Sequence, residues 1–148
     1  MALEVGGALS AEIPVGWRLR AIMAAALIPP MLELLPLTRL ERVLTFTARA
    51  QMSSVPDDLV AARWVDDTLA GMPRPWTRTC LRRAVVLYHL MRAAGRAVDL
   101  CIGVRRDERG EMLAHAWLLR DGDLYLEPDS TSGLVSRYSV IARFPQRP

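Results

Sequence analysis

The stretch TCLRRAVVLYHLMRAAGRAVDLCIGVR, residues 79–105, decides the fold, because the spacing of its apolar residues changes partway along it. Thr79 suits the N-cap of a helix over 80–94, and Gly95 stands where helices commonly end. From Val98 onward, apolar residues alternate with polar or small ones, and this period of two predicts a strand. A helix therefore leads directly into a sheet.

The sequence on the C-terminal side continues the strand pattern. After a polar turn at 106–110, residues 112–119 and 124–127 predict two strands around Asp121–Gly122. Residues 134–144 predict a further strand. We expect these segments to form one antiparallel sheet.

The sequence on the N-terminal side predicts helices. Residues 17–28 are apolar apart from Arg18 and Arg20 at the start, and Pro29–Pro30 should end that helix. Residues 37–52 have one apolar face, and a third helix begins at 57–58 and ends near Gly71. The proline-containing segment that follows must be a loop.

Helices first and strands afterwards indicate the α+β class rather than an alternating parallel fold. We expect N-terminal helices followed by a core in which one helix packs on an antiparallel sheet. The 148 residues fit a single domain over 1–148, with a helical part over 1–72 and the core over 73–148.

Composition narrows the class of protein. The two cysteines form no disulfide framework, and the N-terminus has no cluster of positive charge, so we expect free thiols and a cytoplasmic protein. The longest uncharged apolar stretch, 21–32, is shorter than the roughly 20 residues that span a bilayer, which leaves at most a peripheral membrane contact. Arginines interspersed with acids argue against nucleic-acid binding. No residues have metal-ligand spacing, and we expect no metal or cofactor.

Cys80 is the candidate nucleophile. At the start of a helix, free N–H groups and the helix dipole stabilise a thiolate, and Arg82 and Arg83 add positive charge in the same turn. The backbone N–H of Cys80 is a candidate oxyanion donor. Cys101 alternates with apolar strand positions, and we interpret it as structural.

The sequence contains two histidines that could act as the base. His89 lies nine residues along the same helix as Cys80, about 180° around the axis at ~100° per residue, and cannot reach the thiol. His115 lies on a predicted strand between Ala114 and Ala116, which leave room for close approach. We therefore expect His115 to be the base.

The acid that orients His115 depends on the register of the next hairpin. A two-residue turn at Asp121–Gly122 would place His115 opposite Pro128 and turn Glu127 to the other face. A three-residue loop would place Glu127 directly across from His115, with Asp129 as the diagonal neighbour. Both registers fit the sequence, and Glu127 is the candidate acid if the loop has three residues.

The segments TCLRRA at 79–84, LMRAAG at 90–95, IGV at 102–104 and AHAWL at 114–118 resemble the leader peptidases of lasso-peptide biosynthesis. That family has a transglutaminase-like core that is distantly related to papain, and the resemblance covers about residues 76–130. It implies a cysteine peptidase with Cys80, His115 and Glu127 as its catalytic residues. The third catalytic residue is usually Asp in the family, so Glu127 departs from the pattern.

The resemblance also implies a substrate and partners. Such peptidases cut a ribosomally made precursor peptide between leader and core, and a separate macrolactam cyclase then uses the freed amine. The short chain is similar to the standalone kind, which depends on a separate leader-recognition protein. We expect that protein to meet the N-terminal helices. Trp76 and Trp117 are candidate substrate-binding residues, although Trp76 fits the role of a loop anchor equally well.

Two other functions fit the same residues. A transglutaminase-like acyltransferase or deamidase would pass the acyl group to an amine or replace an amide, using the same three side chains. A non-catalytic scaffold of a peptide-maturation complex would use the helices and arginines only to bind partners. The product mass and the effect of Cys80→Ala distinguish these functions from the peptidase.

Overall fold

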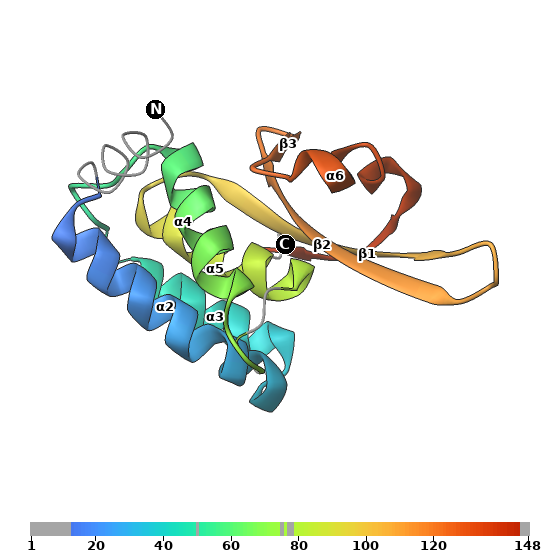
Figure 1. Ribbon diagram of the computed structural model, residues 1–148, viewed down its shortest axis with the longest axis horizontal. Coiled ribbons are helices and arrows are strands. Elements are labelled where there is room, and N and C mark those ends of the chain that lie inside the picture. The colour runs from blue at the N-terminus through green and yellow to red at the C-terminus, as the bar shows by residue number, and fades with distance from the viewer. Residues whose placement is uncertain (1–12, 50, 75, 77–78, 146–148) are drawn as a thin grey trace.

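The computed structural model describes residues 13–145, apart from residues 50, 75, 77 and 78. Within these residues, four helices come first, and four strands with two short helical turns follow (Figure 1). The helices are α2 (Val15–Leu34), α3 (Leu37–Ala48), α4 (Asp58–Ala70) and α5 (Cys80–Ala93). The later elements are β1 (Val98–Arg106), β2 (Met112–Arg120), β3 (Asp123–Tyr125), α6 (Asp129–Ser132), η1 (Val135–Arg137) and β4 (Ser139–Phe144). The chain is therefore of the α+β class, as the sequence predicts.

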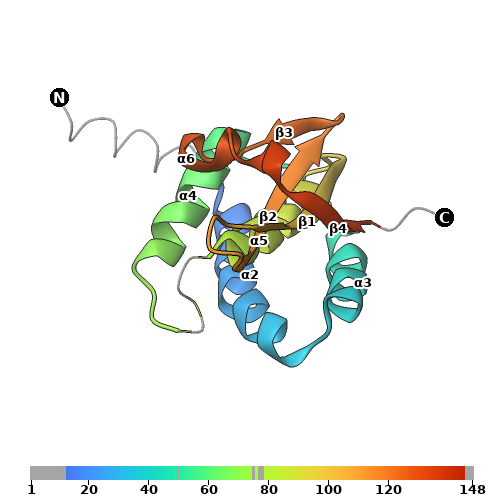
Figure 2. The same cartoon turned by 90° about the vertical axis from the view of Figure 1, so that its right-hand side faces the viewer.

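Helix α5 lies at the centre of the molecule, between the other long helices and the sheet (Figure 2). Thr79 caps it, and Gly95 follows its end with a φ of +82°, so both predicted helix signals are confirmed. Every residue from Arg83 to Met91 is buried. One apolar core surrounds α5 and includes side chains from α2, α3, α4 and the inner face of the sheet. This packing fixes the position of the helix that begins with Cys80.

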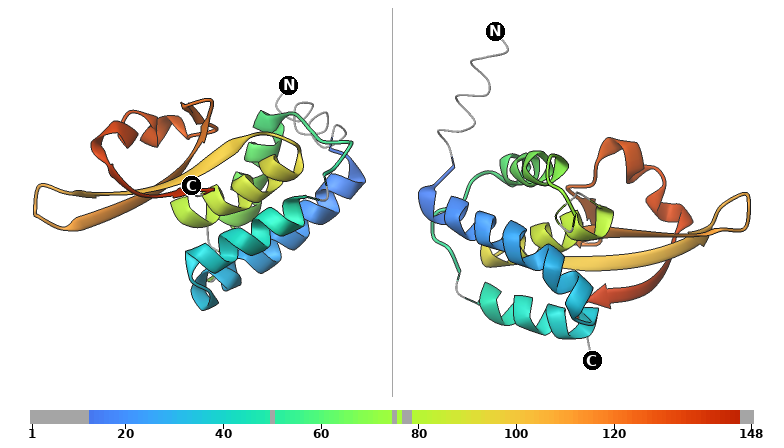
Figure 3. Two further views of the ribbon diagram at one scale, coloured as in Figure 1. Left: turned by 180° about the vertical axis from the view of Figure 1, so that it is seen from behind. Right: turned by 60° about the horizontal axis from the view of Figure 1, so that its bottom comes forward.

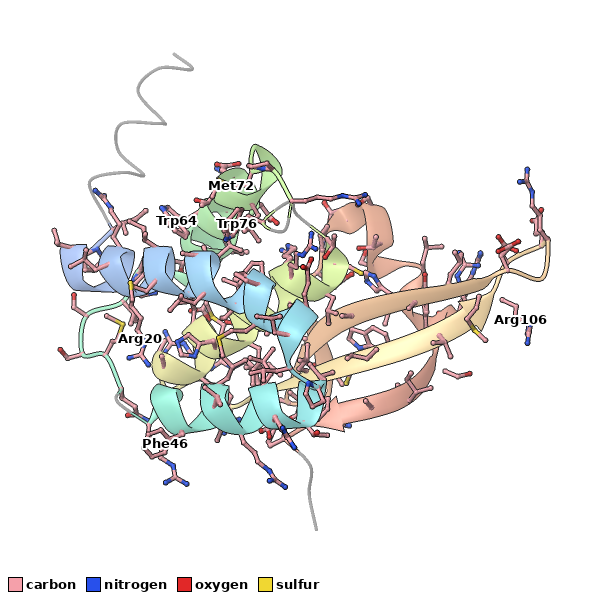
Figure 4. The ribbon with its side chains drawn as sticks, turned by 90° about the horizontal axis from the view of Figure 1, so that it is seen from below. Arg20, Phe46, Trp64, Met72, Trp76 and Arg106 are labelled. Atoms are coloured by element: carbon pink, nitrogen blue, oxygen red, sulfur yellow. The ribbon has the colours of Figure 1, made fainter. Side chains whose placement is uncertain are left out.

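The strands form one antiparallel sheet with the order β3-β2-β1-β4. The β1–β2 hairpin is long, and its far end projects away from the helices (Figure 1; Arg106 is labelled near that end in Figure 4). Strand β3 is short and pairs only with Leu118–Arg120 of β2. The structure also contains α6 and η1, which the strand pattern did not predict.

Helix α2 does not end at Pro29–Pro30, and that expectation is wrong: it continues to Leu34 (Figure 3). A proline inside a helix lacks the N–H that would bond the carbonyl four residues earlier. For Pro30 that carbonyl belongs to Ala26, and the indole Nε1–H of Trp76 bonds to it at 2.9 Å. The indole N–H of Trp76 thus replaces the main-chain donor that Pro30 lacks.

Other boundaries differ modestly from the predictions. Helix α3 starts at Leu37 as expected but ends at Ala48, four residues early. Helix α4 begins after Asp57, whose side chain accepts from the N–H of Leu59 at 2.9 Å. The expected start at 57–58 and end near Gly71 therefore agree with α4 to within one residue.

Helix α2 has a buried face and an exposed apolar face. Trp17, Ala21 and Ala25 are buried in the core around α5. Within the described ranges, α2 is the one helix that is long and apolar enough to cross a membrane, and these two properties alone are weak evidence for a span. Its solvent-facing side has an uncharged stripe that consists of Val15, Leu19, Ile22, Met23 and Leu27, each about half exposed or more.

Candidate active site

Cys80 occupies the first position of α5 and is partly exposed. The Thr79 hydroxyl accepts from the N–H of Arg82 at 3.2 Å, which caps the helix. The N–H of Cys80 belongs to the first turn, where no intrahelical acceptor exists. Cys101 is different: it is 1% exposed, and burial raises the pKa of its thiol. The structure thus presents one thiol to solvent at a helix start and buries the other.

A cavity of about 120 Å³ lies at this helix start. It is bounded by the first turn of α5, by the middle of β2 and by the segment 127–131. Its lining includes Cys80, His115 and Glu127, together with Thr79, Arg83 and Thr131. Elements separated by tens of residues in the sequence therefore bring the three predicted side chains to one site.

His115 and Glu127 are in direct contact. The Nε2 of His115 lies 2.6 Å from Oε1 of Glu127, and the two side chains are only 11% and 4% exposed. The hydroxyl of Thr131 donates to the same oxygen at 2.7 Å. Because Nε2 is engaged by the carboxylate, Nδ1 is the ring nitrogen left to face another group. A buried carboxylate that fixes an imidazole in this way is the geometry of a positioned catalytic base.

The His115–Glu127 contact forms in the two-residue hairpin register, in which Glu127 was expected to face away from His115. Asp121 and Gly122 have φ values of 54° and 83°, which makes a two-residue type I′ turn, and Arg120 pairs with Asp123. The expectation that Glu127 meets His115 only with a three-residue loop is therefore wrong. Strand β3 stops at Tyr125, and Leu126 has a φ of 57°, which turns the chain before Glu127.

Asp129 is the diagonal neighbour that a three-residue loop would give His115. It is exposed and begins the short helix α6. Its side chain is not part of the cavity lining, whereas Glu127 is. Among the described residues, the structure therefore favours Glu127 over Asp129 as the acid.

Trp117 does not lie in the cavity, contrary to its expected role in substrate binding. It is 3% exposed, and its ring is stacked near that of His115 with centroids 5.9 Å apart. Tyr138 lies against both rings, 5.5 Å from His115 and 6.2 Å from Trp117. Strand alternation puts Trp117 on the same face as His115, but the η1–β4 segment covers that part of the face. Trp117 therefore packs against the His115 ring outside the cavity.

Trp76 is also outside the cavity lining. It is half-buried, and its indole bonds to Ala26 on α2, as described above (Figure 4). Its backbone N–H donates to the carbonyl of Pro73 at 2.8 Å. Of its two expected roles, the structure supports that of a loop anchor. Pro75, Thr77 and Arg78 of the same loop lie outside the described residues.

The two arginines after Cys80 have acidic partners, which reduces the positive charge expected beside the thiol. Arg82 bonds to Glu33 at 3.1 Å, and Arg83 bonds to Asp66 at 2.6 Å. Arg83 also donates to the main-chain carbonyl of Leu126 at 2.7 Å. It therefore joins α4, α5 and the turn before Glu127, and no local pattern in the sequence indicates this role.

His89 lies away from this site, as helix geometry predicts. It is 6% exposed, and its Nε2 accepts from Nε of Arg20 on α2 at 3.4 Å. Burial, and secondarily the charge of Arg20, lower its pKa to about 4. His89 is therefore a neutral core residue near pH 7.

Comparison with known families gives one match. The family model described as the transglutaminase-like superfamily matches residues 16–143, which includes the N-terminal helices as well as the sheet. This superfamily consists mainly of cysteine-dependent enzymes. No curated protein and no solved structure matches the chain.

Proposed function

The chain belongs to the transglutaminase-like superfamily, and we propose that it is a cysteine peptidase that removes the leader from a lasso-peptide precursor. The observation that carries the proposal is the 2.6 Å contact between His115 and Glu127 in a cavity that Cys80 also lines. A thiol, an imidazole and a buried carboxylate are the three parts of a nucleophile–base–orienter arrangement.

The first half of the reaction forms an acyl-enzyme. His115 takes the proton of Cys80 through Nδ1, and the thiolate attacks the carbonyl carbon of the last leader residue. The oxyanion accepts hydrogen bonds from N–H groups at the start of α5, including that of Cys80. His115 then gives its proton to the departing nitrogen, so that the C–N bond breaks and the core peptide leaves with a free amine.

The second half releases the leader. Water enters the cavity, His115 removes its proton, and the oxygen attacks the thioester carbon. The C–S bond breaks, and the leader leaves with a free carboxylate while Cys80 regains a proton. Throughout both halves, Glu127 holds the Nε2–H side of the ring, and Thr131 keeps the carboxylate in place.

The proposed partners are a precursor peptide, a separate leader-recognition protein and a macrolactam cyclase. Their support is the resemblance of the segments around Cys80 and His115 to lasso-peptide leader peptidases. The two free cysteines fit action in a reducing cytoplasm. The exposed apolar stripe of α2 supports a protein contact on the N-terminal helices.

The test is incubation of the purified chain with the recognition protein and the precursor peptide encoded beside its gene, followed by mass spectrometry. We expect two fragments whose masses add up to the precursor plus one water. Cys80→Ala should abolish the fragments, and the matched control Cys101→Ala should leave them. His115→Gln and His89→Gln form a second matched pair with the same expectation.

The same spectra distinguish the competing functions. A deamidase would raise the mass of the precursor by about one dalton. An acyltransferase would add the mass of an amine and remove that of ammonia. Neither enzyme would cleave the precursor. If the chain is only a scaffold, the Cys80→Ala variant should support processing of the precursor as well as the wild type does. Any of these three results would overturn the proposed peptidase.

A further inference from the structure

The outer edge of β2 is open beside the active-site cavity. Strand β3 pairs with β2 only at Leu118–Arg120, and no other described strand pairs with the outer side of β2. Directly after β3 ends, Leu126 has a positive φ, and the segment 127–131 that follows lies beside β2 only at the cavity, next to His115 and Ala116. Among the described residues, Met112 to Ala114 of β2 therefore form a sheet edge that has no strand paired on its outer side.

The main-chain groups that face this edge can be assigned. In a type I′ hairpin the residues that flank the turn, Arg120 and Asp123, exchange hydrogen bonds, so even-numbered residues of β2 face β3. At the other end of β2, the N–H of Asp107 bonds to the carbonyl of Glu111, which places odd-numbered residues toward β1. Both ends therefore agree that the N–H and C=O of Ala114 point outward.

The free edge is continuous with the cavity. His115 and Ala116 line the cavity, and Ala114 and Met112 follow along the same strand toward the projecting end of the hairpin (Figure 1). Ala114 is exposed and has only a methyl group, and Met112 is 58% exposed. A chain that reaches Cys80 in an extended form can therefore run on beside these residues without displacing a side chain.

We propose that the outer edge of β2 binds the peptide substrate as an added strand, with the N–H and C=O of Ala114 as its main-chain partners. This inference rests on the proposed peptidase function and specifies how the segment next to the scissile bond is held. Main-chain pairing supplies affinity with little dependence on side chains. Such pairing keeps the scissile bond extended and beside the thiol.

The first test is Ala114→Pro. Proline removes the outward N–H of residue 114, and this N–H takes no part in the β1–β2 ladder, so the sheet should persist. We expect kcat/KM for the precursor peptide to fall about tenfold or more. The matched control is Ile141→Pro, on the opposite edge strand β4, where Ile141 has no partner in the β1–β4 register and is 64% exposed. The control should keep kcat/KM within about twofold.

The second test leaves the enzyme unchanged, which removes any doubt about folding of the proline variant. Synthetic precursor peptides carry a single N-methyl group at successive residues on both sides of the scissile bond. An added strand uses alternate N–H groups, so we expect losses in kcat/KM at every second position on one side. Uniform tolerance of N-methylation, with Ala114→Pro at wild-type rates, would overturn the added strand while leaving the peptidase intact.

Failure of the peptidase itself gives a different result. In that case the wild-type chain would not cleave the unmodified peptide, or Cys80→Ala would cleave it equally well.

Hydrogen exchange on the Cys80→Ala variant measures peptide binding independently of cleavage. Addition of the unmodified peptide should slow exchange of the Ala114 amide and leave that of Ile141 unchanged, and equal rates at Ala114 with and without peptide would count against the added strand.

Discussion

The guanidinium of Arg83 donates a 2.7 Å hydrogen bond to the main-chain carbonyl of Leu126, the residue that turns the chain just before Glu127. A leucine with positive φ is strained and persists only where its surroundings hold it. Arg83 provides such a hold, because Asp66 fixes its guanidinium from the other side. The position of the carboxylate next to His115 thus depends on a residue one turn after the nucleophile.

Arg83→Lys should therefore reduce catalysis more than substrate binding. Lysine keeps the charge opposite Asp66 but cannot bond the acid and the Leu126 carbonyl with one planar fork. We expect kcat to fall about tenfold to a hundredfold with KM nearly unchanged, measured by steady-state cleavage of the precursor. Arg82→Lys, which alters the more exposed pair with Glu33, is the control and should leave kcat within about twofold. A rise in KM at constant kcat would contradict a positioning role for Arg83.

Gly103→Ala should disturb the support behind His115. A Cβ at residue 103 would lie 2.7 Å from Cη2 of Trp117 and 2.9 Å from Cβ of Tyr138, and Gly103 pairs with His115 across the strands. We expect the free energy of unfolding to fall by about 1–3 kcal/mol, as for other overpacked sites, together with a lower kcat.

The measurement for this variant is urea unfolding alongside steady-state kinetics. Gly16→Ala is the control, because the nearest atom to its added Cβ would be the terminal methyl of Met52 at 3.9 Å. That substitution, in the first turn of α2, should leave stability unchanged or slightly higher. Equal stability of the Gly103→Ala variant and the wild type would show that the sheet can relax around the new methyl group.

Stability should depend on pH through His89. Its pKa is about 4 in the folded chain and about 6.5 when the chain unfolds, so only the unfolded chain binds the proton between these values. The contribution of His89 is therefore complete above about pH 6.5 and declines as the pH falls toward 4, by up to roughly 3 kcal/mol. Urea titrations at several pH values measure this slope. His89→Gln should flatten it in that window, and an unchanged slope would assign the effect to other groups.

Trp76→Phe separates an anchor from a substrate-binding residue. The variant keeps the ring but loses the N–H that bonds to the Ala26 carbonyl. We expect the free energy of unfolding to fall by about 1 kcal/mol and KM to stay unchanged. Thermal unfolding and peptide cleavage measure the two quantities. A large rise in KM with unaltered stability would place Trp76 at the substrate instead.

Charge on the exposed stripe of α2 should interfere with partner binding. Met23→Glu adds an acid at a position that is 58% exposed, so the fold should be preserved while an apolar contact is lost. We expect at least a tenfold weaker Kd for the leader-recognition protein, measured by calorimetry. Leu59→Glu on α4, at a position that is 71% exposed, is the control. Equal affinities of the two variants for the recognition protein would show that this protein docks on a surface other than the α2 stripe.

The elements with local signals could be predicted from the sequence. The Thr79 cap and Gly95 delimit α5, and alternation locates β1 and β2 to within a residue or two at each end. Helix geometry alone excluded His89 as the base. In each case the decisive interactions lie within a few residues of one another, so periodicity and capping are sufficient.

The features that depend on distant contacts could not be predicted. The sequence fits either hairpin register, and nothing in it indicates that Leu126 turns the chain and brings Glu127 to His115. Burial of Trp117 follows from the η1–β4 segment, which crosses the face after the strand pattern has ended. Strand alternation specifies a face, and it does not specify what covers that face.

The bond between Trp76 and Ala26 makes two distant positions depend on each other. Pro30 leaves the Ala26 carbonyl without its helical donor, and Trp76 supplies a replacement. An alanine at position 30 would return a competing N–H to that carbonyl, so a substitution that improves α2 by propensity would loosen the loop leading to Cys80. Among related chains we therefore expect residues 30 and 76 to covary, with tryptophan retained where proline is and lost where it is not.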